Sequence, residues 1–147
     1  MDHVLPLLIE RATAARERQA ATMRVAYRAL EQAGATLGKL QDFRGECIAR
    51  APASTGQSTD AETLAAQQRF VTRLDDAIGQ QSIEAQARAH RAAEQQALLA
   101  QAQQRLLAFE TLARRRLEQK NAREHRRELR DGDEFAALAA RRRKDNE

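Results

Sequence analysis

The sequence predicts an all-α protein, a single domain in which two long helices fold back on each other as an antiparallel two-helix coiled-coil hairpin. Aromatic residues make up 3% of the chain and Trp is absent, so the bulky residues of a globular core are missing. Two prolines and six glycines leave long uninterrupted stretches of helix-forming residues in the 147-residue chain. The larger apolar residues recur at heptad spacing on both sides of one loop-like segment.

The first helix is expected over residues 6–50. Pro6 suits a first helical turn, because the N–H that proline lacks has no helical partner there. Of the thirteen heptad positions a and d between residues 5 and 47, ten are apolar, and the exceptions are Arg16, Gln19 and Arg44. The apolar set is Ile9, Met23, Leu30 and Leu37 at a, with Leu5, Ala12, Ala26, Ala33, Leu40 and Cys47 at d. A pattern kept over six heptads predicts a coiled-coil seam.

A turn is expected over residues 51–59, where Pro52 ends the first helix and small and polar residues follow. Thr59 and Glu62 have the spacing of a capping box, in which the Thr59 hydroxyl accepts a hydrogen bond from the third helical amide. A short connection between two heptad helices makes them antiparallel neighbours. With the turn centred near residue 55, the numbers of two facing residues are expected to sum to roughly 110, so that Pro6 faces about Gln104.

The second helix is expected over residues 60–131, followed by a basic tail over 132–147. Its a positions are all apolar: Leu64, Val71, Ile78, Ala85, Ala92, Leu99, Leu106 and Ala113. Its d positions are mixed: Gln67, Leu74, Gln81, Arg88, Gln95, Ala102 and Phe109. Arg116 and Lys120 end the apolar seam, and Gly132 between two aspartates predicts a break, because glycine follows the last helical residue of many helices.

The positive charge collects at one end of the chain. Residues 1–113 carry 13 cations and 13 anions, whereas residues 114–147 carry 12 against 8 and account for the net charge of +4. This end of the second helix extends past its partner. On charge alone it suits an acidic protein, nucleic acid or an anionic membrane surface, and a merely solvated helix face fits equally well.

The sequence contains no recognisable catalytic or metal-binding group, so we expect no enzymatic activity, no cofactor and no metal. His3, His90 and His125 have no His or Cys three or four residues away. Cys47 is the only cysteine and sits at a d position, so we interpret it as a seam thiol in a protein of a reducing compartment. No stretch approaches the roughly 20 apolar residues that span a bilayer, which favours a cytosolic or at most peripheral protein.

Phe43 and Phe70 depart from the seam pattern, since both fall at heptad position g. In an antiparallel pair g faces g, and the two rings are expected side by side on one flank. The same flank carries Thr36 and Ala77 at g, with Leu40, Cys47, Leu74 and Gln81 at the adjoining d positions. Exposed aromatic residues favour a docking surface, and the alternative is that the rings locally broaden the core.

Two segments resemble the flagellar FliJ family of bacterial type III export systems. Residues 70–81, FVTRLDDAIGQQ, resemble the family's F-x-x-x-L-x-x-A-I-x-Q-Q stretch. Residues 117–120, LEQK, followed by 133–136, DEFA, are similar to its basic, acid-tipped end. Leu37, Leu40 and Phe43 fit the pattern that precedes the family's turn, and the likeness covers essentially the whole chain.

The resemblance implies a helical hairpin similar to the central-stalk coiled coil of rotary ATPases. It implies that the chain ends contact the hexameric export ATPase and promote ring assembly, through Arg114, Arg115, Arg116, Lys120 and Arg123. It further implies that the tip binds the cytoplasmic linker of the membrane export gate and couples export to the proton gradient. The gate-binding positions are Thr36, Leu40, Phe43, Cys47, Phe70, Leu74, Ala77 and Gln81. Cys47 and Gln81 replace an aromatic residue and a histidine of the family.

The resemblance also implies escort of export chaperones, no contact with nucleic acid, and a cytoplasmic protein that associates peripherally with the inner membrane. Three alternatives remain open. One is the equivalent stalk of a virulence-type injectisome, another is a generic basic coiled-coil scaffold, and the third is a nucleic-acid binder. The last has few aromatic residues for base stacking, and acidic residues interrupt its basic end.

Overall fold

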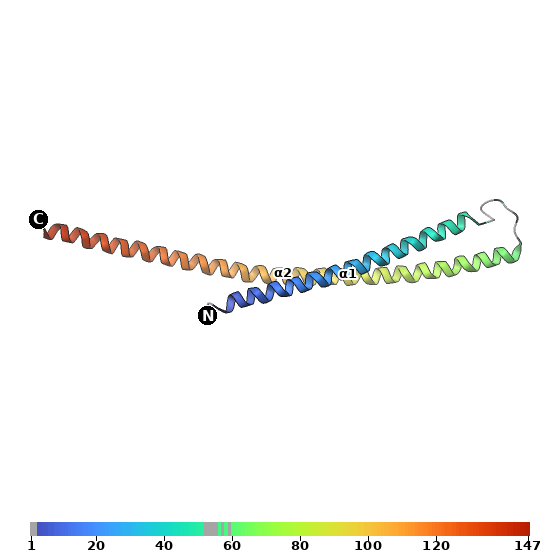
Figure 1. Ribbon diagram of the computed structural model, residues 1–147, viewed down its shortest axis with the longest axis horizontal. Helices are drawn as coiled ribbons and strands as arrows, with labels where there is room; N and C mark the ends of the chain where they lie inside the picture. The colour runs from blue at the N-terminus through green and yellow to red at the C-terminus, as the bar shows by residue number, and fades with distance from the viewer. Residues whose placement is uncertain (1–2, 52–55, 57, 59) are drawn as a thin grey trace. The chain divides into compact units, whose positions relative to one another are not determined.

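The computed structural model describes residues 3–51, 56, 58 and 60–147. These residues form two helices, α1 over Val4–Ala49 and α2 over Ala61–Asp145 (Figure 1). The described part of the chain contains no strand, and the predicted all-α antiparallel hairpin is confirmed. Contacts divide the chain into two units, Ala14–Ala102 and Met1–Thr13 with Gln103–Glu147.

In the unit Ala14–Ala102, α1 and α2 run antiparallel and side by side. Gln19 Nε2 donates a hydrogen bond of 2.6 Å to Gln95 Oε1. Further along α1, the partner of Ala33 is Gln81, which lies earlier in α2. The pairing of residues across the two helices is shifted from the expected register. Gln19 lies beside Gln95, whereas a sum of roughly 110 places it opposite about residue 91.

The seam of this unit follows the predicted heptads. Every predicted a and d position from 16 to 47 and from 67 to 102 is buried or half-buried, and only Leu64 is exposed, at 37%. The deepest residues are Ala33 and Ala92, each 1% exposed. Because alanine carries only a methyl group, these positions allow the two helices to approach closely, since interaxial distance follows the size of the contact residues.

Three polar residues that α2 contributes to the seam form hydrogen bonds with α1. Gln81 and Arg88 donate hydrogen bonds to backbone carbonyls, at 3.1 Å from Gln81 Nε2 to the oxygen of Ala33 and 3.0 Å from Arg88 Nη1 to that of Ala29. Gln95, seven residues after Arg88, accepts from Gln19. Buried polar groups need such partners, and a slip along the seam would break all three contacts.

The unit Met1–Thr13 with Gln103–Glu147 has a shorter core. Leu5, Ala12 and Leu106 are buried, while Ile9, Phe109 and Ala113 are half-buried. Pro6 is the third residue of α1, as expected for a proline in the first turn. All residues of 114–147 are exposed, so the second helix continues past its last packed position as predicted.

The helix bounds differ from those predicted. α2 was expected to end at residue 131 and give way to a tail, but it continues through Gly132 to Asp145. A single interior glycine costs about 1 kcal/mol relative to alanine, which the helix-forming residues on both sides outweigh. No proline follows to stop the helix, and Gly56 is the only described glycine with a positive φ, at 75°.

The turn is bounded by two well-defined helix ends. α1 ends at Ala49, where Arg50 N–H donates to Glu46 O at 3.0 Å and Ala51 N–H to Ile48 O at 3.2 Å. Asp60 caps α2, since its Oδ1 accepts a hydrogen bond of 2.8 Å from Thr63 N–H. The capping box predicted on Thr59 lies outside the described residues. Hydrogen bonds from the Thr63 side chain and backbone hold the pKa of Asp60 below its ordinary value.

Replacing Ala92 by leucine tests the close approach in the seam. Because the Ala92 side chain is 1% exposed, extra methylene groups have no room. We expect Ala92→Leu to lower the free energy of unfolding by about 1–3 kcal/mol in urea titrations followed by circular dichroism. The control is Ala93→Leu at the exposed neighbouring position, which we expect to change it by less than about 0.5 kcal/mol. An equal loss of unfolding free energy in both variants would contradict the burial of Ala92 in the seam.

The Asp60 cap predicts a pH-dependent contribution to stability. A pKa held below its ordinary value stabilises the fold above the pKa of the unfolded chain, about 3.9, and this contribution is lost as the pH falls through the folded value. At pH 7 we expect Asp60→Ala to melt below the unaltered chain, and this difference in melting temperature to narrow as the pH falls below about 3.9 and the carboxyl loses its charge. The Asp60→Asn variant, a neutral cap, should keep its advantage over Asp60→Ala at low pH. A difference in melting temperature between Asp60→Ala and the unaltered chain that stays the same at every pH would contradict the charged cap.

Candidate functional site

The two predicted phenylalanines meet on the flank of the helix pair. The rings of Phe43 on α1 and Phe70 on α2 lie edge to face, with centroids 6.1 Å apart and an interplanar angle of 84°. Their exposed fractions are 48% and 46%, so each ring still presents about half of its surface to solvent. The predicted juxtaposition of the two rings is confirmed, and the rings lie outside the buried seam.

The aromatic patch is the set of eight residues predicted on this flank: Thr36, Leu40, Phe43, Cys47, Phe70, Leu74, Ala77 and Gln81. Its accessible surface is made mainly by the two rings and Thr36. Leu74 is 8% exposed and packs beneath this surface. Leu40, Cys47 and Ala77 are half-buried, and the side-chain amide of Gln81 is engaged with Ala33 O. The structure therefore brings the set together, but only part of it is free to touch a partner.

A cross-helix ion pair beside the rings was not predicted. Arg44 Nε donates to Asp75 Oδ1, and Arg44 Nη2 lies 3.4 Å from Asp75 Oδ2. The hydrogen bond to Asp75, and then its negative charge, raise the pKa of Arg44. In the heptad pattern Arg44 is only a polar exception in the seam. The pair joins heptad position a of α1 to position e of α2, a contact that the pattern of a and d positions does not predict.

The basic residues predicted to bind the ATPase lie on exposed turns of α2, but they do not form one cluster. Arg116, Lys120 and Arg123 line a cavity of about 660 Å³. Its apolar wall is formed by Leu5, Pro6, Ile9, Ala113 and Leu117. Arg114 and Arg115 lie outside this cavity. The structure thus joins three of the five basic residues to the start of α1.

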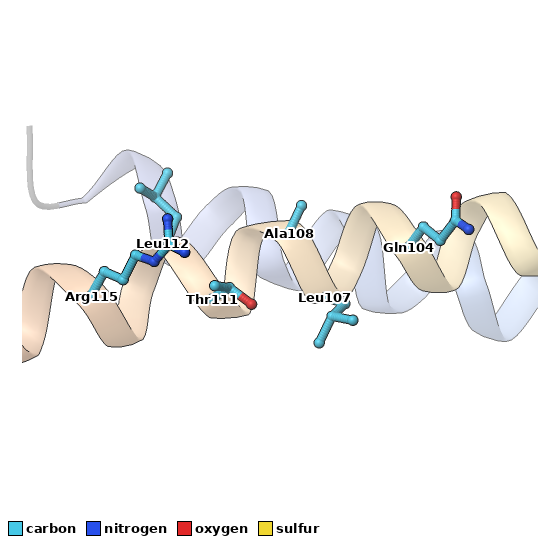
Figure 2. A pocket seen from close by; sticks show the side chains of 6 residues that line it. All are labelled: Gln104, Leu107, Ala108, Thr111, Leu112 and Arg115. Atoms are coloured by element: carbon cyan, nitrogen blue, oxygen red, sulfur yellow. The ribbon is translucent and has the colours of Figure 1, made fainter.

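Arg115 belongs to a second, shallower groove of about 550 Å³ (Figure 2). The groove is lined by α2 alone, from Gln104 through Leu107, Ala108, Thr111 and Leu112 to Arg115. Leu107 and Leu112 are 61% and 42% exposed. This groove is mainly an apolar stretch of helix surface with one cation at its end.

Neither helix of the described residues is long and apolar enough to cross a membrane. Among residues 3–51, 56, 58 and 60–147, no group of three or more His, Cys, Asp or Glu side chains could hold a metal ion. His90 has a carboxylate neighbour instead, with its Nε2 3.1 Å from Glu94 Oε1.

Comparison with protein families decides the relationship. The sequence matches the family model of the Flagellar FliJ protein over residues 1–145. The chain belongs to the FliJ family. Neither the curated proteins nor the solved structures give a match. FliJ proteins are stalk proteins related to flagellar export and have a structural rather than enzymatic role. Membership therefore makes this chain a component of the flagellar export apparatus.

A double-mutant cycle tests the ring contact in this FliJ protein. An edge-to-face aromatic pair contributes about 0.5–1.5 kcal/mol beyond the area it buries. We therefore expect Phe43→Ala and Phe70→Ala to be non-additive by about that amount in urea unfolding. The control cycle joins Phe43→Ala to Val25→Ala, an exposed position elsewhere on α1, and should be additive within about 0.5 kcal/mol. An additive Phe43–Phe70 cycle would contradict the contact.

Proposed function

We propose that this chain is a stalk component of the flagellar type III export apparatus that links two partners. The aromatic patch binds the cytoplasmic linker of the membrane export gate, and the basic end of α2 binds the hexameric export ATPase. The observation that carries the proposal is the half-exposed ring pair of Phe43 and Phe70. Phe70 also opens the stretch that resembles the FliJ pattern.

The chemistry of the aromatic patch suits a protein partner. Aromatic side chains are enriched among the residues that dominate binding energy, because they bury a large area at little entropic cost. Phe43 and Phe70 hold each other in one geometry, so little of their freedom remains to be lost on binding. Leu74 supports this surface from below, and the Arg44–Asp75 pair joins the same two helices beside it.

The basic end suits an acidic partner. Arg114, Arg115, Arg116, Lys120 and Arg123 are exposed and available for contact with acidic side chains of the ATPase ring. Such exposed pairs are screened beyond about 8–10 Å at physiological salt, so this contact should weaken as salt rises. Through it the chain promotes assembly of the ring and couples the ATPase to the gate.

The remaining parts of the proposal follow the family. The chain has no enzymatic activity of its own, uses no cofactor or metal, and hands on empty export chaperones. It acts in the cytoplasm, peripherally associated with the inner membrane through the gate, without contacting nucleic acid. The FliJ match over residues 1–145 favours the flagellar system over an injectisome stalk or a generic scaffold.

Two variants should separate the two contacts. The double variant Phe43→Ala/Phe70→Ala should lose at least tenfold in affinity for the cytoplasmic domain of the gate, since aromatic anchors contribute about 2 kcal/mol or more each. It should still stimulate the ATPase. Deletion of residues 114–147, all exposed, should abolish stimulation and leave gate binding intact.

Circular dichroism and urea unfolding of both variants check that the helix pair persists. The proposal fails if either variant loses both activities while remaining folded. It also fails if the deletion leaves stimulation of the ATPase unchanged.

A further inference from the structure

The heptad register of α2 does not stop where its apolar residues stop. Counting on from Ala113, the next five a and d positions are all cationic: Arg116, Lys120, Arg123, Arg127 and Arg130. We call these five residues the cationic stripe. All five are exposed, and α2 is continuous through them. The face that packs on α1 earlier in the helix therefore carries a single row of positive charge here.

No acidic residue of this segment occupies an a or d position, although Glu124 lies four residues after Lys120 and three before Arg127. Residues 114–130 hold eight cations and three anions, and Glu118, Glu124 and Glu128 occupy positions f, e and b. The cations of the stripe follow one another at alternating spacings of four and three residues, so neighbours face each other on the helix surface. Like charges at these spacings oppose helix formation unless an opposite charge compensates them.

No ion pair within the described part of the chain compensates these charges. The ion pairs in the described part of the chain join Arg44 to Asp75, Arg88 to Glu84 and His90 to Glu94, and none involves the stripe. A solvated helix face needs no order in the placement of its cations. Here every a and d position is cationic, although cations fill only eight of the seventeen positions in the segment.

The cavity at the start of α1 specifies the partner further. It joins Arg116, Lys120 and Arg123 of the stripe to an apolar wall that includes Leu5, Pro6, Ile9 and Leu117. A polypeptide that follows the stripe toward the start of α1 thus meets first cations and then apolar side chains. Its complement is a segment with carboxylates along most of one face and an apolar residue at one end.

We propose that the cationic stripe binds an acidic α-helix whose carboxylates are spaced three and four residues apart. This helix lies along α2 and continues the seam beyond the start of α1. The stripe is about 21 Å long at 1.5 Å per residue, which corresponds to about four turns of partner helix. The inference deepens the proposed ATPase contact and rests on it only for the identity of the partner. It shifts the contact from Arg114 and Arg115 to Arg127 and Arg130.

A synthetic peptide tests the stripe without any export component. The probe has three heptads with Glu at every a and d position, Ala and Gln elsewhere, and one Leu at the end that meets the cavity. The matched control has the same composition with its glutamates spread over all faces. In fluorescence anisotropy with the full-length chain, we expect the patterned peptide to bind at least tenfold more tightly.

Two triple variants with the same change in charge locate the site. Lys120→Gln/Arg123→Gln/Arg127→Gln removes three cations of the stripe and should weaken the patterned peptide at least tenfold. Arg126→Gln/Arg141→Gln/Arg142→Gln removes three exposed cations of the same helix outside the stripe and should weaken the peptide less than threefold. Glutamine is a good helix former, and circular dichroism checks that both variants stay helical.

Charge reversal distinguishes loss of the site from misfolding, because the reversed variant is expected to gain binding to a different peptide. The Lys120→Glu/Arg123→Glu/Arg127→Glu variant should reject the glutamate peptide and bind a peptide with Lys at the same a and d positions. Failure of this exchange in a helical variant would overturn the proposal. Equal binding of the two glutamate peptides, or equal losses in the two glutamine variants, would also overturn it and indicate unspecific attraction.

Duplex DNA and vesicles containing phosphatidylserine are measured in parallel. Tighter binding of either through the stripe would overturn the choice of an acidic helix. Failure of the peptide, together with ATPase stimulation that disappears when residues 114–147 are deleted, would remove this inference and leave the proposed function standing. Peptide binding through the stripe without any ATPase contact would leave this inference standing and remove the proposed ATPase contact.

Discussion

The close packing of two alanine-rich helix faces is the constraint on which the rest of this FliJ protein depends. Ala33 and Ala92 are almost completely buried, and small side chains hold α1 and α2 close together. A narrow seam leaves large side chains on its flanks only partly covered, which is why Phe43 and Phe70 pair there and remain half exposed. The packing that stabilises the helix pair thus also creates the surface proposed to bind the gate.

Alanine packing alone specifies register weakly, because one methyl group resembles the next. Gln81, Arg88 and Gln95 supply that specification through hydrogen bonds to α1. The same register brings Arg44 to Asp75 and Phe43 to Phe70. Beyond Ala113 the heptad repeat persists but its chemistry changes to cationic. One repeat therefore serves an internal partner along most of α2 and, in our proposal, an external acidic helix at its end.

The heptad repeat allowed most of this fold to be predicted from sequence, because burial at positions a and d follows from helix geometry. The register was offset because the length of the turn does not determine where its centre lies. The break predicted at Gly132 does not occur, because the helix formers on both sides outweigh the cost of one interior glycine. The Arg44–Asp75 pair could not be predicted, because it joins a seam position to position e outside the seam pattern. The apolar pattern does not predict the cationic stripe, because the stripe keeps the heptad spacing without apolar residues.

In our proposal, two separate surfaces of one chain serve two different partners. Amide hydrogen exchange of the full-length protein, measured with each partner in turn, tests it most directly. With the export ATPase, we expect slower exchange in residues 116–130 and unchanged exchange in residues 36–47 and 70–81. With the cytoplasmic domain of the gate, we expect the opposite pattern. Protection of the same residues by both partners, or protection confined to the seam between 85 and 106, would contradict the account.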